Sequence, residues 1–243
     1  MPRQRRKKPD PFQGFARWAE AEPASPQVTR DGVVRRALEV LNEDGFDGLT
    51  MRRLAEKLGI KAASLYNHVK DKDELLALMA NAICAEIPDL DHTRPWREQA
   101  ERMALQVRTV LMAHRDGARV LAATPPVGPH RLRLIEQLLH ALVGAGLSRA
   151  RVVDAAFVMN SYVVGFVLDE TLGYPADTAS LKRMREEGRR WFKSLPRQKY
   201  PTLVAFADEL VDAPADRRFK LGLRALLDGL QLESSKKRKR ASR

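Results

Sequence analysis

The chain has 243 residues, of which 44% are hydrophobic, a size that favours one small domain followed by a larger one. No apolar run approaches the roughly 20 residues needed to cross a bilayer, no secretory leader is evident, and the single cysteine excludes an internal disulfide framework, so a soluble protein is expected. The formal net charge of +12 lies almost wholly at the two ends, with +4 in residues 1–10 and +6 in residues 234–243, so the chain between them is nearly neutral.

The chain begins with a basic, proline-punctuated arm, residues 1–28. Its first ten residues carry Arg3, Arg5, Arg6, Lys7 and Lys8, and prolines follow as far as Pro26. This composition is typical of a mostly disordered segment, with a helical turn around Phe15–Ala19. Two interpretations remain open: an arm that follows a DNA groove, as in homeodomains, or a solvated charged tail.

Residues 29–87 are predicted to form a head of three helices and a connecting fourth helix. The first helix is expected over Arg30–Asp44, with an apolar stripe of Val33, Val34, Ala37, Leu38 and Leu41. Thr50 is an N-cap residue and Gly59 is a helix-stop residue, which predicts a second helix of about two turns between them.

A third helix is predicted to begin after Lys61. Ala62, Leu65 and Val69 recur at helical spacing and are expected to face inward, which leaves four hydrogen-bonding residues outward: Ser64, Tyr66, Asn67 and His68. Such a face suits a recognition helix in the DNA major groove. Basic residues also outnumber acidic ones in this segment, which favours phosphate contact. On spacing alone, DNA recognition and plain packing of a helix pair remain equally open.

The fourth helix is predicted to start at Asp71, its N-cap, with Glu74 placed as in a capping box. Its apolar face towards Pro88 consists of Leu75, Leu78, Met79, Ile83 and Ile87, and Cys84 is expected to be a small core residue. This helix would join head to body as a rod, so that a tilt at its far end would move the third helix.

Beyond Pro88 the apolar spacing stays helical, which predicts an all-α bundle over residues 88–233. Helices are expected at Pro95–His114, Pro129–Val143, Arg149–Leu172, Ala179–Leu195 and Asp216–Leu232.

The predicted helix at Arg149–Leu172 is apolar on nearly every side and is therefore expected to be buried all round. The last helix carries a stripe of Phe219, Leu223, Leu226 and Leu230. These two helices could pair with their copies from a second subunit. The tail, residues 234–243, contains KKRKR, a run that fits either a nuclear address or a phosphate-binding tail.

The head resembles the DNA-binding domain of the TetR family of bacterial transcription regulators over Thr29–Ile87. The matching features are Asp44-Gly45-Phe46 at the end of an amphipathic helix, LT-x-R-x-LAEKLG, Leu65-Tyr66 followed by His68-Val69 and Lys72, and a leucine-rich helix from Asp73.

Two further stretches, AHRDGARVLAAT at Ala113–Thr124 and VVGFVLDE at Val163–Glu170, resemble the regulatory domain of tetracycline-binding members of this family. The resemblance implies an all-α chain, in which a helix-turn-helix head is linked by the fourth helix to a helical ligand-binding and dimerisation domain.

The resemblance also implies a homodimer on double-stranded operator DNA, whose two third helices would lie about one DNA turn apart and read an inverted repeat. By position, the DNA contacts would be Thr50, Arg52, Ala63, Ser64, Tyr66, Asn67, His68 and Lys72. Phosphate contacts are expected from Thr50, Tyr66, His68 and Lys72, and base contacts from Arg52, Ser64 and Asn67, with Ala63 against a thymine methyl. Ala62 and Ala63 stand where the tetracycline-binding member has glutamine and proline, so a different operator is expected.

The regulatory stretch departs from the tetracycline pattern at Leu121, where the tetracycline-binding member has a metal-ligating histidine. Leucine cannot coordinate Mg²⁺, so neither a metal nor a cofactor is expected. The effector is expected to be a hydrophobic or aromatic small molecule, antibiotic-like or a secondary metabolite, in a mainly apolar pocket. The predicted lining is Val107, Leu121, Thr124, Pro126, Gln137, Met159, Asn160 and Phe166. For each of these residues taken alone, plain packing is the competing interpretation.

No catalytic site is predicted. His114-Arg115-Asp116 echoes the catalytic loop of protein kinases, but the sequence shows none of the glycine-rich loop, strand lysine and DFG motif that this chemistry needs. Two functions remain open. One is a ligand-responsive regulator of the bacterial cytoplasm and nucleoid, a repressor by family expectation; the other is a basic helical protein that organises DNA or scaffolds partners without sensing a small molecule. The stretch Ala113–Glu170 favours the first.

Overall fold

In this computed structural model the described residues are 29–171 and 178–241, with side chains described as far as Leu232, so the predictions for residues 1–28 lie outside the described part. The described residues form twelve helices and no strand, which confirms the predicted all-α class. The helices are α1 (Arg30–Gly48), α2 (Met51–Leu58), α3 (Ala62–Leu65), α4 (Lys72–Ala85), α5 (Trp96–Ala113), α6 (Gly117–Ala122), α7 (Pro129–Val143), α8 (Arg149–Thr171), α9 (Thr178–Ser194), α10 (Pro201–Ala205), α11 (Ala207–Asp212) and α12 (Ala215–Ala241).

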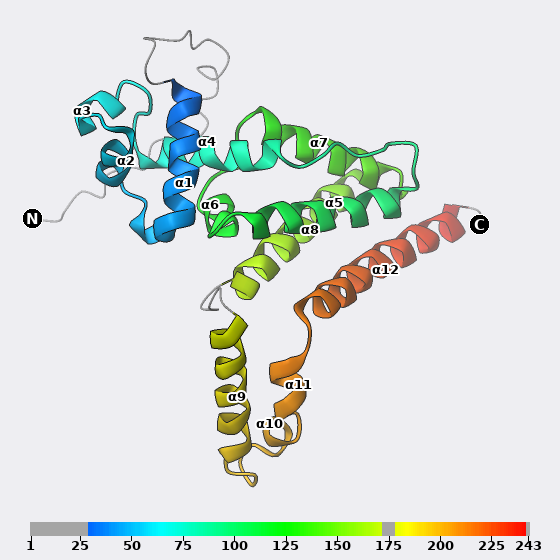
Figure 1. Ribbon diagram of the computed structural model, residues 1–243. Coiled ribbons are helices and arrows are strands. Elements are labelled where there is room, and N and C mark those ends of the chain that lie inside the picture. Colours follow the sequence, from blue (N-terminus) through cyan, green and yellow to red (C-terminus); the bar gives the residue numbers. More distant parts are fainter. Residues whose placement is uncertain (1–28, 172–177, 242–243) are drawn as a thin grey trace, which may run out of the picture.

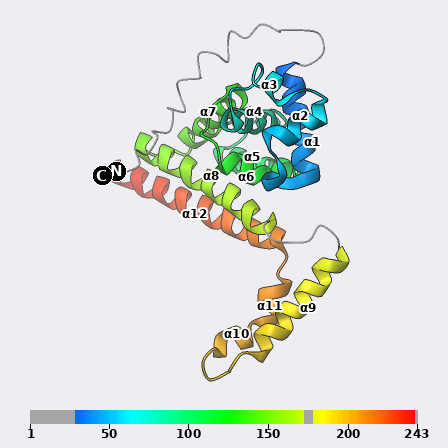
Figure 2. The ribbon, with the colours of Figure 1, turned by 90° about the vertical axis from the view of Figure 1, so that its left-hand side faces the viewer.

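The helices fall into a head, a body and a projecting arm (Figure 1). Helices α1 to α3 form the head at one end, and α4 runs from the head into a body that contains α5 to α8. Helix α12 lies along α8, as two views at right angles agree (Figure 2). The arm consists of α9, α10 and α11, which pack on one another and extend away from the body.

Local capping sets the helix boundaries of the head. The Thr50 hydroxyl oxygen accepts a hydrogen bond from the Arg53 amide at 3.1 Å, and Gly59 ends α2 in the left-handed conformation with φ 67°. At the start of α4 the Asp71 carboxylate accepts from the Glu74 amide at 2.8 Å. The Glu74 carboxylate accepts in turn from the amide of Lys70, one residue before the cap. The predicted caps Thr50, Gly59 and Asp71 are therefore confirmed, whereas the return bond expected in a capping box goes to Lys70 and not to Asp71.

The first helix is interrupted at Gly45, whose φ of 76° and ψ of 179° are not helical. Regular helix therefore runs from Arg30 to Asp44, as predicted, and the chain then makes one further turn to Gly48. This interruption sets the direction in which Phe46 and Asp47 leave the helix, and both residues meet the body.

One apolar core runs without a break from the head into the body. It includes Val33, Leu41 and Leu54 of the head, the buried face of α4, and body residues such as Leu111 and Leu121. Its members from α4 are Leu75, Leu76, Met79, Ala80, Ile83 and Cys84. Because the same helix is buried against both parts, head and body share one continuous core, which we call one packing unit. This shared core is how α4 connects the two parts.

Cys84 is buried, as predicted, and burial raises the pKa of its thiol to about 11. A second core joins α5, α8 and α12 around Phe219, Leu223 and Leu227. The buried members of the stripe predicted on the last helix, Phe219 and Leu223, pack within their own chain on α8 and α5, so pairing of the two helices with a second subunit would use their other faces.

Helix α8 is not buried on all sides within the single chain, so the predicted all-round burial would require a second subunit. Val152, Ala155, Met159, Val163 and Val167 face the body, whereas Phe157 is 72% exposed on another face. Within the described residues, α8 is also the one helix long and apolar enough to cross a membrane, contrary to the expectation of no such run. This helix qualifies by its length and composition only, and a core helix of a soluble protein can have the same length and composition.

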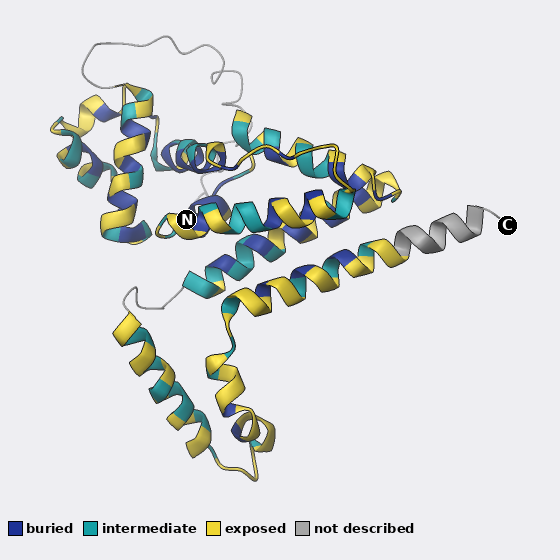
Figure 3. Ribbon diagram, turned by 45° about the vertical axis from the view of Figure 1, so that its right-hand side comes forward, coloured by how far each residue is buried: buried dark blue, intermediate teal, exposed yellow. Residues whose placement is uncertain are grey.

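The arm is the least buried part of the described chain (Figure 3). Helix α9 has no buried residue among those described, and the arm leaves Trp191, Leu203, Phe206 and Leu210 exposed. It is held internally by ion pairs, in which Arg189 contacts Asp208 and Asp212 at 3.0 and 2.5 Å, and Lys193 contacts Asp208 at 2.8 Å. Helices α10 and α11, and the short α6, were not predicted, because five or six residues give too little periodicity to detect.

Gly45→Ala is expected to lower the free energy of unfolding by about 2 kcal/mol, within the roughly 1–3 kcal/mol typical of a residue held in a sparsely populated backbone region. A Cβ at this position would also lie 3.1 Å from both Arg115 Nη2 and Asp116 Oδ2. Gly59→Ala is the matched control, because its φ is also positive but its surroundings are open, and about 1 kcal/mol is expected there. Urea unfolding at one protein concentration measures both. Equal losses would contradict the crowding at Gly45.

Candidate DNA interface and regulatory domain

The predicted recognition helix is a single short turn. Helix α3 spans only four residues, its N-cap residue Lys61 makes no side-chain capping bond, and Asn67 and His68 follow in a turn whose amides bond to carbonyls three residues back. Helix formation was predicted to continue towards Val69. The α-helix ends at Leu65 because the Asn67 and His68 amides bond to carbonyls three residues back, in the tighter pattern of a 3₁₀ turn.

The outward face of this turn agrees with the predicted one, apart from one residue. Leu65 and Val69 are buried against the head, while Ala63, Ser64, Tyr66 and Asn67 are exposed, and His68 is half-buried. Ala62 is exposed, so its predicted inward orientation is wrong: it opens the helix, before the chain has turned towards the core. The exposed group offers two hydroxyls and an amide on one small projection.

The basic residues of the head divide into fixed and available ones. Arg53 contacts the Asp44 carboxylate at 2.6 Å and ties α2 to α1; this guanidinium lowers the pKa of Asp44. Lys57 pairs with Glu43, again between α2 and α1. The Arg52 side chain contacts Glu56 at 3.0 Å but remains 88% exposed, so little limits its movement towards a ligand.

Lys72 lies at the first position of α4 beside the aromatic ring of Phe46, with its Nζ 5.3 Å from the ring centroid. The eight predicted DNA-contact residues thus lie in α2 and its N-cap, in α3 and its following turn, and at the start of α4, so all are in the head or directly beside it. The Thr50 hydroxyl, used as a cap acceptor, still has a proton to donate to a phosphate.

The head meets the body at the turn His114 to Gly117, the run that resembled a kinase loop. Here Asp116, in the left-handed conformation with φ 56°, accepts from the Phe46 amide at 2.8 Å. Arg115 donates to the Glu43 carbonyl at 2.6 Å, and His114 lies 3.0 Å from both carboxylate oxygens of Glu86 at the end of α4. These residues are used for domain contact, a role that sequence reasoning did not assign.

The predicted effector residues differ in burial, and Gln137 is half-buried. Leu121 and Thr124 are buried, Leu121 in the core shared with the head, while Met159 is buried in the second core. Val107 packs against both cores, and Phe166 against the second. Pro126 and Asn160 are exposed in the single chain. Of the eight, Leu121 and Thr124 are in direct contact, since the Thr124 hydroxyl lies 3.3 Å from the Leu121 carbonyl, and Val107 packs against the core that contains Leu121.

Polar groups near the predicted pocket are engaged in holding helices together. Gln137 accepts from the Leu90 amide at 3.0 Å and donates to Asp89. Arg131 donates to the Thr124 hydroxyl at 2.7 Å and to the Pro125 carbonyl at 2.9 Å, so it closes the end of α6. Burial lowers the pKa of Arg131.

Phe166 belongs to an aromatic cluster where α5, α8 and α12 meet. Its ring lies 5.8 Å from that of Tyr162 and 5.2 Å from that of Phe219, and the Tyr162 hydroxyl donates to the Phe219 carbonyl at 2.7 Å. Arg108 covers this cluster and pairs with both oxygens of Glu170 at 2.7 and 3.0 Å; these bonds raise the pKa of Arg108. These contacts give Phe166 a packing role.

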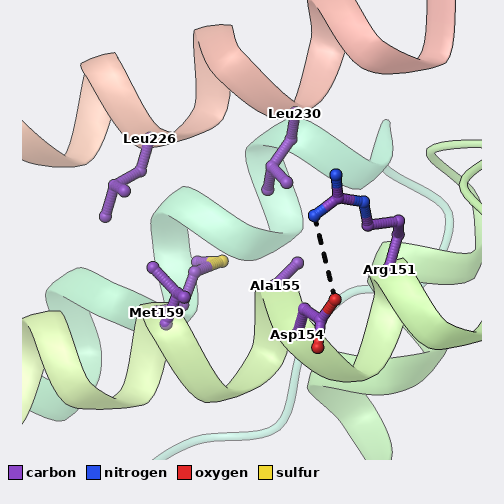
Figure 4. Close-up of a pocket in the computed structure, with 7 residues that line it drawn as sticks. Arg151, Asp154, Ala155, Met159, Leu226 and Leu230 are labelled. Atoms are coloured by element: carbon purple, nitrogen blue, oxygen red, sulfur yellow. Dashed lines mark ion pairs between the residues drawn. The ribbon is translucent and has the colours of Figure 1, made fainter.

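A small pocket of about 120 Å³ opens between α8 and α12 (Figure 4). Met159 and Ala155 form its floor, Leu226 and Leu230 project from α12, and Arg151 pairs with Asp154 at 3.8 Å at its edge. Pockets for small organic ligands usually measure about 300 Å³ or more, so this one is too small to be the effector site by itself.

Large apolar side chains are exposed on the outer faces of α8 and α12, away from the contact between these two helices. They are Val153, Phe157 and Val158 of α8, and Leu221 and Leu232 of α12. Exposed apolar patches of this kind mark protein contacts.

The regulatory stretch departs from a metal-binding pattern at the position of Leu121. Within the described residues, no group of three or more His, Cys, Asp or Glu side chains could hold a metal ion. Leu121, at the position of the expected histidine, is buried among apolar neighbours.

Both parts of the chain match known family models. Residues 33–79 match the model for bacterial regulatory proteins of the tetR family, and residues 88–233 match the tetracyclin repressor-like C-terminal domain. The chain is 36% identical over 203 residues to the tetracycline repressor protein class A from transposon 1721 of Escherichia coli, which covers 82% of this chain and 88% of the relative. An HTH-type transcriptional regulator of Saccharopolyspora erythraea is 34% identical over 166 residues, or 68% and 70% of the two chains.

Among solved structures, the chain is similar to the TetR family protein ActR of Streptomyces coelicolor in complex with actinorhodin. The TM-score is 0.75 at 31% identity, and the match covers 86% of this chain and 99% of ActR. The similarity thus extends over head and body together.

Phe157→Asp is expected to convert a dimer into a monomer, because it places a charge in the middle of the exposed apolar face of α8. Light scattering coupled to size-exclusion chromatography measures the mass directly. Leu132→Asp on α7 is the control, since Leu132 is also an exposed apolar residue but lies on a different helix. A Phe157→Asp protein that stays dimeric would exclude this face as the subunit interface.

Proposed function

The chain belongs to the TetR family of bacterial transcription regulators, and we propose that it represses transcription by binding an inverted-repeat operator as a homodimer, from which a hydrophobic or aromatic small molecule releases it. The observation that carries this proposal is the single core that runs through head and body, because it places an exposed polar turn and a ligand-sensing domain on one packing unit. The match of residues 88–233 to the regulatory domain favours this function over a DNA-organising protein without a sensor.

We propose four parts of the chain: a basic N-terminal segment at 1–28, a DNA-binding head with its connecting helix at 29–87, a regulatory body at 88–233 and a basic tail at 234–243. Dimerisation would use the outer faces of α8 and α12, where apolar residues are exposed. A two-fold symmetric dimer presents two copies of the α3 turn, which calls for a symmetric DNA site.

At the DNA, we assign two kinds of contact. Arg52, Ser64 and Asn67 would read base edges, with Ala63 against a thymine methyl, because small polar side chains can approach the major groove closely. Thr50, Tyr66, His68 and Lys72 would hold phosphates. The exposure of Ser64, Tyr66 and Asn67 and the freedom of Arg52 support this assignment.

For the effector, we propose an aromatic or otherwise hydrophobic small molecule. ActR, which is similar to this chain over most of its length, has been crystallised with actinorhodin and with (S)-DNPA. We propose that Val107, Leu121 and Thr124 form the inner part of the site, beside Gln137, Met159 and Phe166, and that Pro126 and Asn160 lie at its entrance. The leucine at 121 argues against a metal chelate as the effector.

The family is one of transcription regulators, and we propose that the chain has no catalytic activity. Its place of action would be the bacterial cytoplasm, in association with the nucleoid, because that is where an operator-binding protein finds its DNA.

Asn67→Ala is expected to weaken binding to the operator by about 10-fold or more while leaving binding to random DNA nearly unchanged, since a lost base contact costs roughly 1–3 kcal/mol of discrimination. Fluorescence anisotropy with matched operator and random duplexes measures both. An equal loss on the two duplexes would assign Asn67 to phosphate contact or to structure.

Lys72→Ala is expected to weaken binding to both duplexes and to reduce the dependence of binding on salt, because a phosphate contact releases counterions whatever the sequence. The slope of log K against log salt should fall by about 1 for each subunit. Arg102→Ala is a control of equal charge, because Arg102 is exposed on α5 in the body. A slope that falls equally in both variants would rule out a specific phosphate contact at Lys72.

A further inference from the structure

We propose that Arg119 of α6 is a positioning residue for DNA binding: by occupying the Asp47 carboxylate, it leaves Lys72 available for a DNA phosphate. The inference rests on the proposed function in one respect, because it takes the head to bind DNA and an effector to release it; that the effector acts by displacing α6 is part of the inference. It adds the chemical step by which such a displacement would reach a DNA contact.

Four groups meet where α6 touches the head. The two terminal nitrogens of Arg119 donate to the two carboxylate oxygens of Asp47 at 3.0 and 3.1 Å. The guanidinium carbon of Arg119 lies 4.5 Å from the centroid of the Phe46 ring, and Nζ of Lys72 lies 5.3 Å from the same centroid. One aromatic ring is therefore within cation–π distance of both a body cation and a head cation.

The ring is itself held in place by the body. The Phe46 amide donates to Asp116 at 2.8 Å, and Gly45 before it has the positive φ that directs the chain there. Phe46, and with it the place where Lys72 rests, is thus fixed by the same turn that begins α6. A long, flexible lysine side chain that is already positioned loses less conformational freedom when it binds a phosphate.

The cation that pairs with Asp47 decides whether Lys72 is available for a DNA phosphate. The Asp47 side chain is 84% exposed and adjoins Phe46 in the chain, so its carboxylate is open to solvent beside both cations. The hydrogen bonds and the charge of Arg119, and to a smaller extent the charge of Lys72, lower the pKa of Asp47. A planar guanidinium binds a carboxylate with two parallel bonds, which an ammonium cannot do, so Arg119 holds Asp47 while it is present.

If Arg119 withdraws, the cation left beside this carboxylate is Lys72. Asp47 would then attract the lysine away from DNA and would itself repel the phosphate backbone. The Arg119–Asp47 ion pair is replaced by a Lys72–Asp47 ion pair. The head then has one cation fewer to bind a phosphate and one carboxylate that repels it.

Helix α6 connects this exchange to the regulatory domain. Arg119 lies two residues before Leu121 and five before Thr124, on a helix of only six residues whose end is held by Arg131. Leu121 lies on the same helix as Arg119, and Thr124, just beyond its end, donates its hydroxyl to the Val120 carbonyl at 3.0 Å. A ligand that displaces either residue would therefore move α6 and withdraw Arg119 from Asp47.

The test uses the full chain and a random-sequence DNA duplex, because phosphate contact does not depend on sequence. Arg119→Gln should weaken binding by about 10-fold, on the scale of one surface ion pair in each subunit, and should lower the salt slope by about 2 for the dimer. Asp47→Asn alone should bind within about 3-fold of the wild type, and Asp47→Asn combined with Arg119→Gln should restore affinity and salt slope to that level.

This set separates positioning from a structural bridge. Both single variants remove the same ion pair, so a merely structural role predicts that Asp47→Asn is as weak as Arg119→Gln and that the double variant is no better. Either that result or normal binding by Arg119→Gln would overturn the proposal. Arg102→Gln on α5 controls for lost charge, and thermal unfolding of each variant controls for folding. Should the wild type prefer no operator, the proposed function fails, while these comparisons on random DNA still decide the role of Arg119.

Discussion

The burial of α4 against two partners at once is the constraint on which the rest of this structure depends. One face of the helix contributes Leu75, Met79 and Ile83 to a core that also contains head residues and body residues. Protein interiors are close-packed and do not deform continuously, so the head cannot turn on the body without some repacking along this helix. A signal sensed in the body therefore has a rigid route to the exposed polar turn at α3.

The second connection between head and body is polar and of a different physical kind. At the turn from His114 to Gly117, and at Arg119 just after it, the body holds the end of α1 by hydrogen bonds and ion pairs at the surface. Such contacts are individually weak and can exchange partners at little cost, whereas a buried apolar contact leaves a cavity when it separates. The combination suits a regulator: the apolar core keeps the two parts together, and the polar junction offers alternative pairings that differ by little in free energy.

Local signals made much of the fold predictable from the sequence. Thr50, Gly59 and Asp71 act within a few residues of themselves, so their capping roles can be seen without a structure, and the long helices of the body have enough apolar periodicity to be located. The exposed face at Ser64 and Asn67 followed from the same spacing. The predicted effector residues are more dispersed than expected, because apolar spacing identifies core positions and cannot distinguish a ligand-lining leucine from a packed one.

What the sequence did not reveal depends on residues far apart in the chain or on a second chain. The contacts of Arg119 with Asp47 and of Asp116 with Phe46 join residues about 70 positions apart, and nothing local in either segment indicates the other. The apolar composition of α8 predicts that its faces are buried. It does not say whether the same chain or a second subunit covers the face that is exposed here. The arm formed by α9, α10 and α11 depends on pairings of the same kind. The most direct measurement of the central claim is sequencing of the DNA that the purified full chain retains from a random pool. If the protein is a two-fold symmetric dimer in which each head is packed rigidly on its body, a single inverted repeat should be enriched. Recovery of unenriched sequences, or of a motif without two-fold symmetry, would contradict this account.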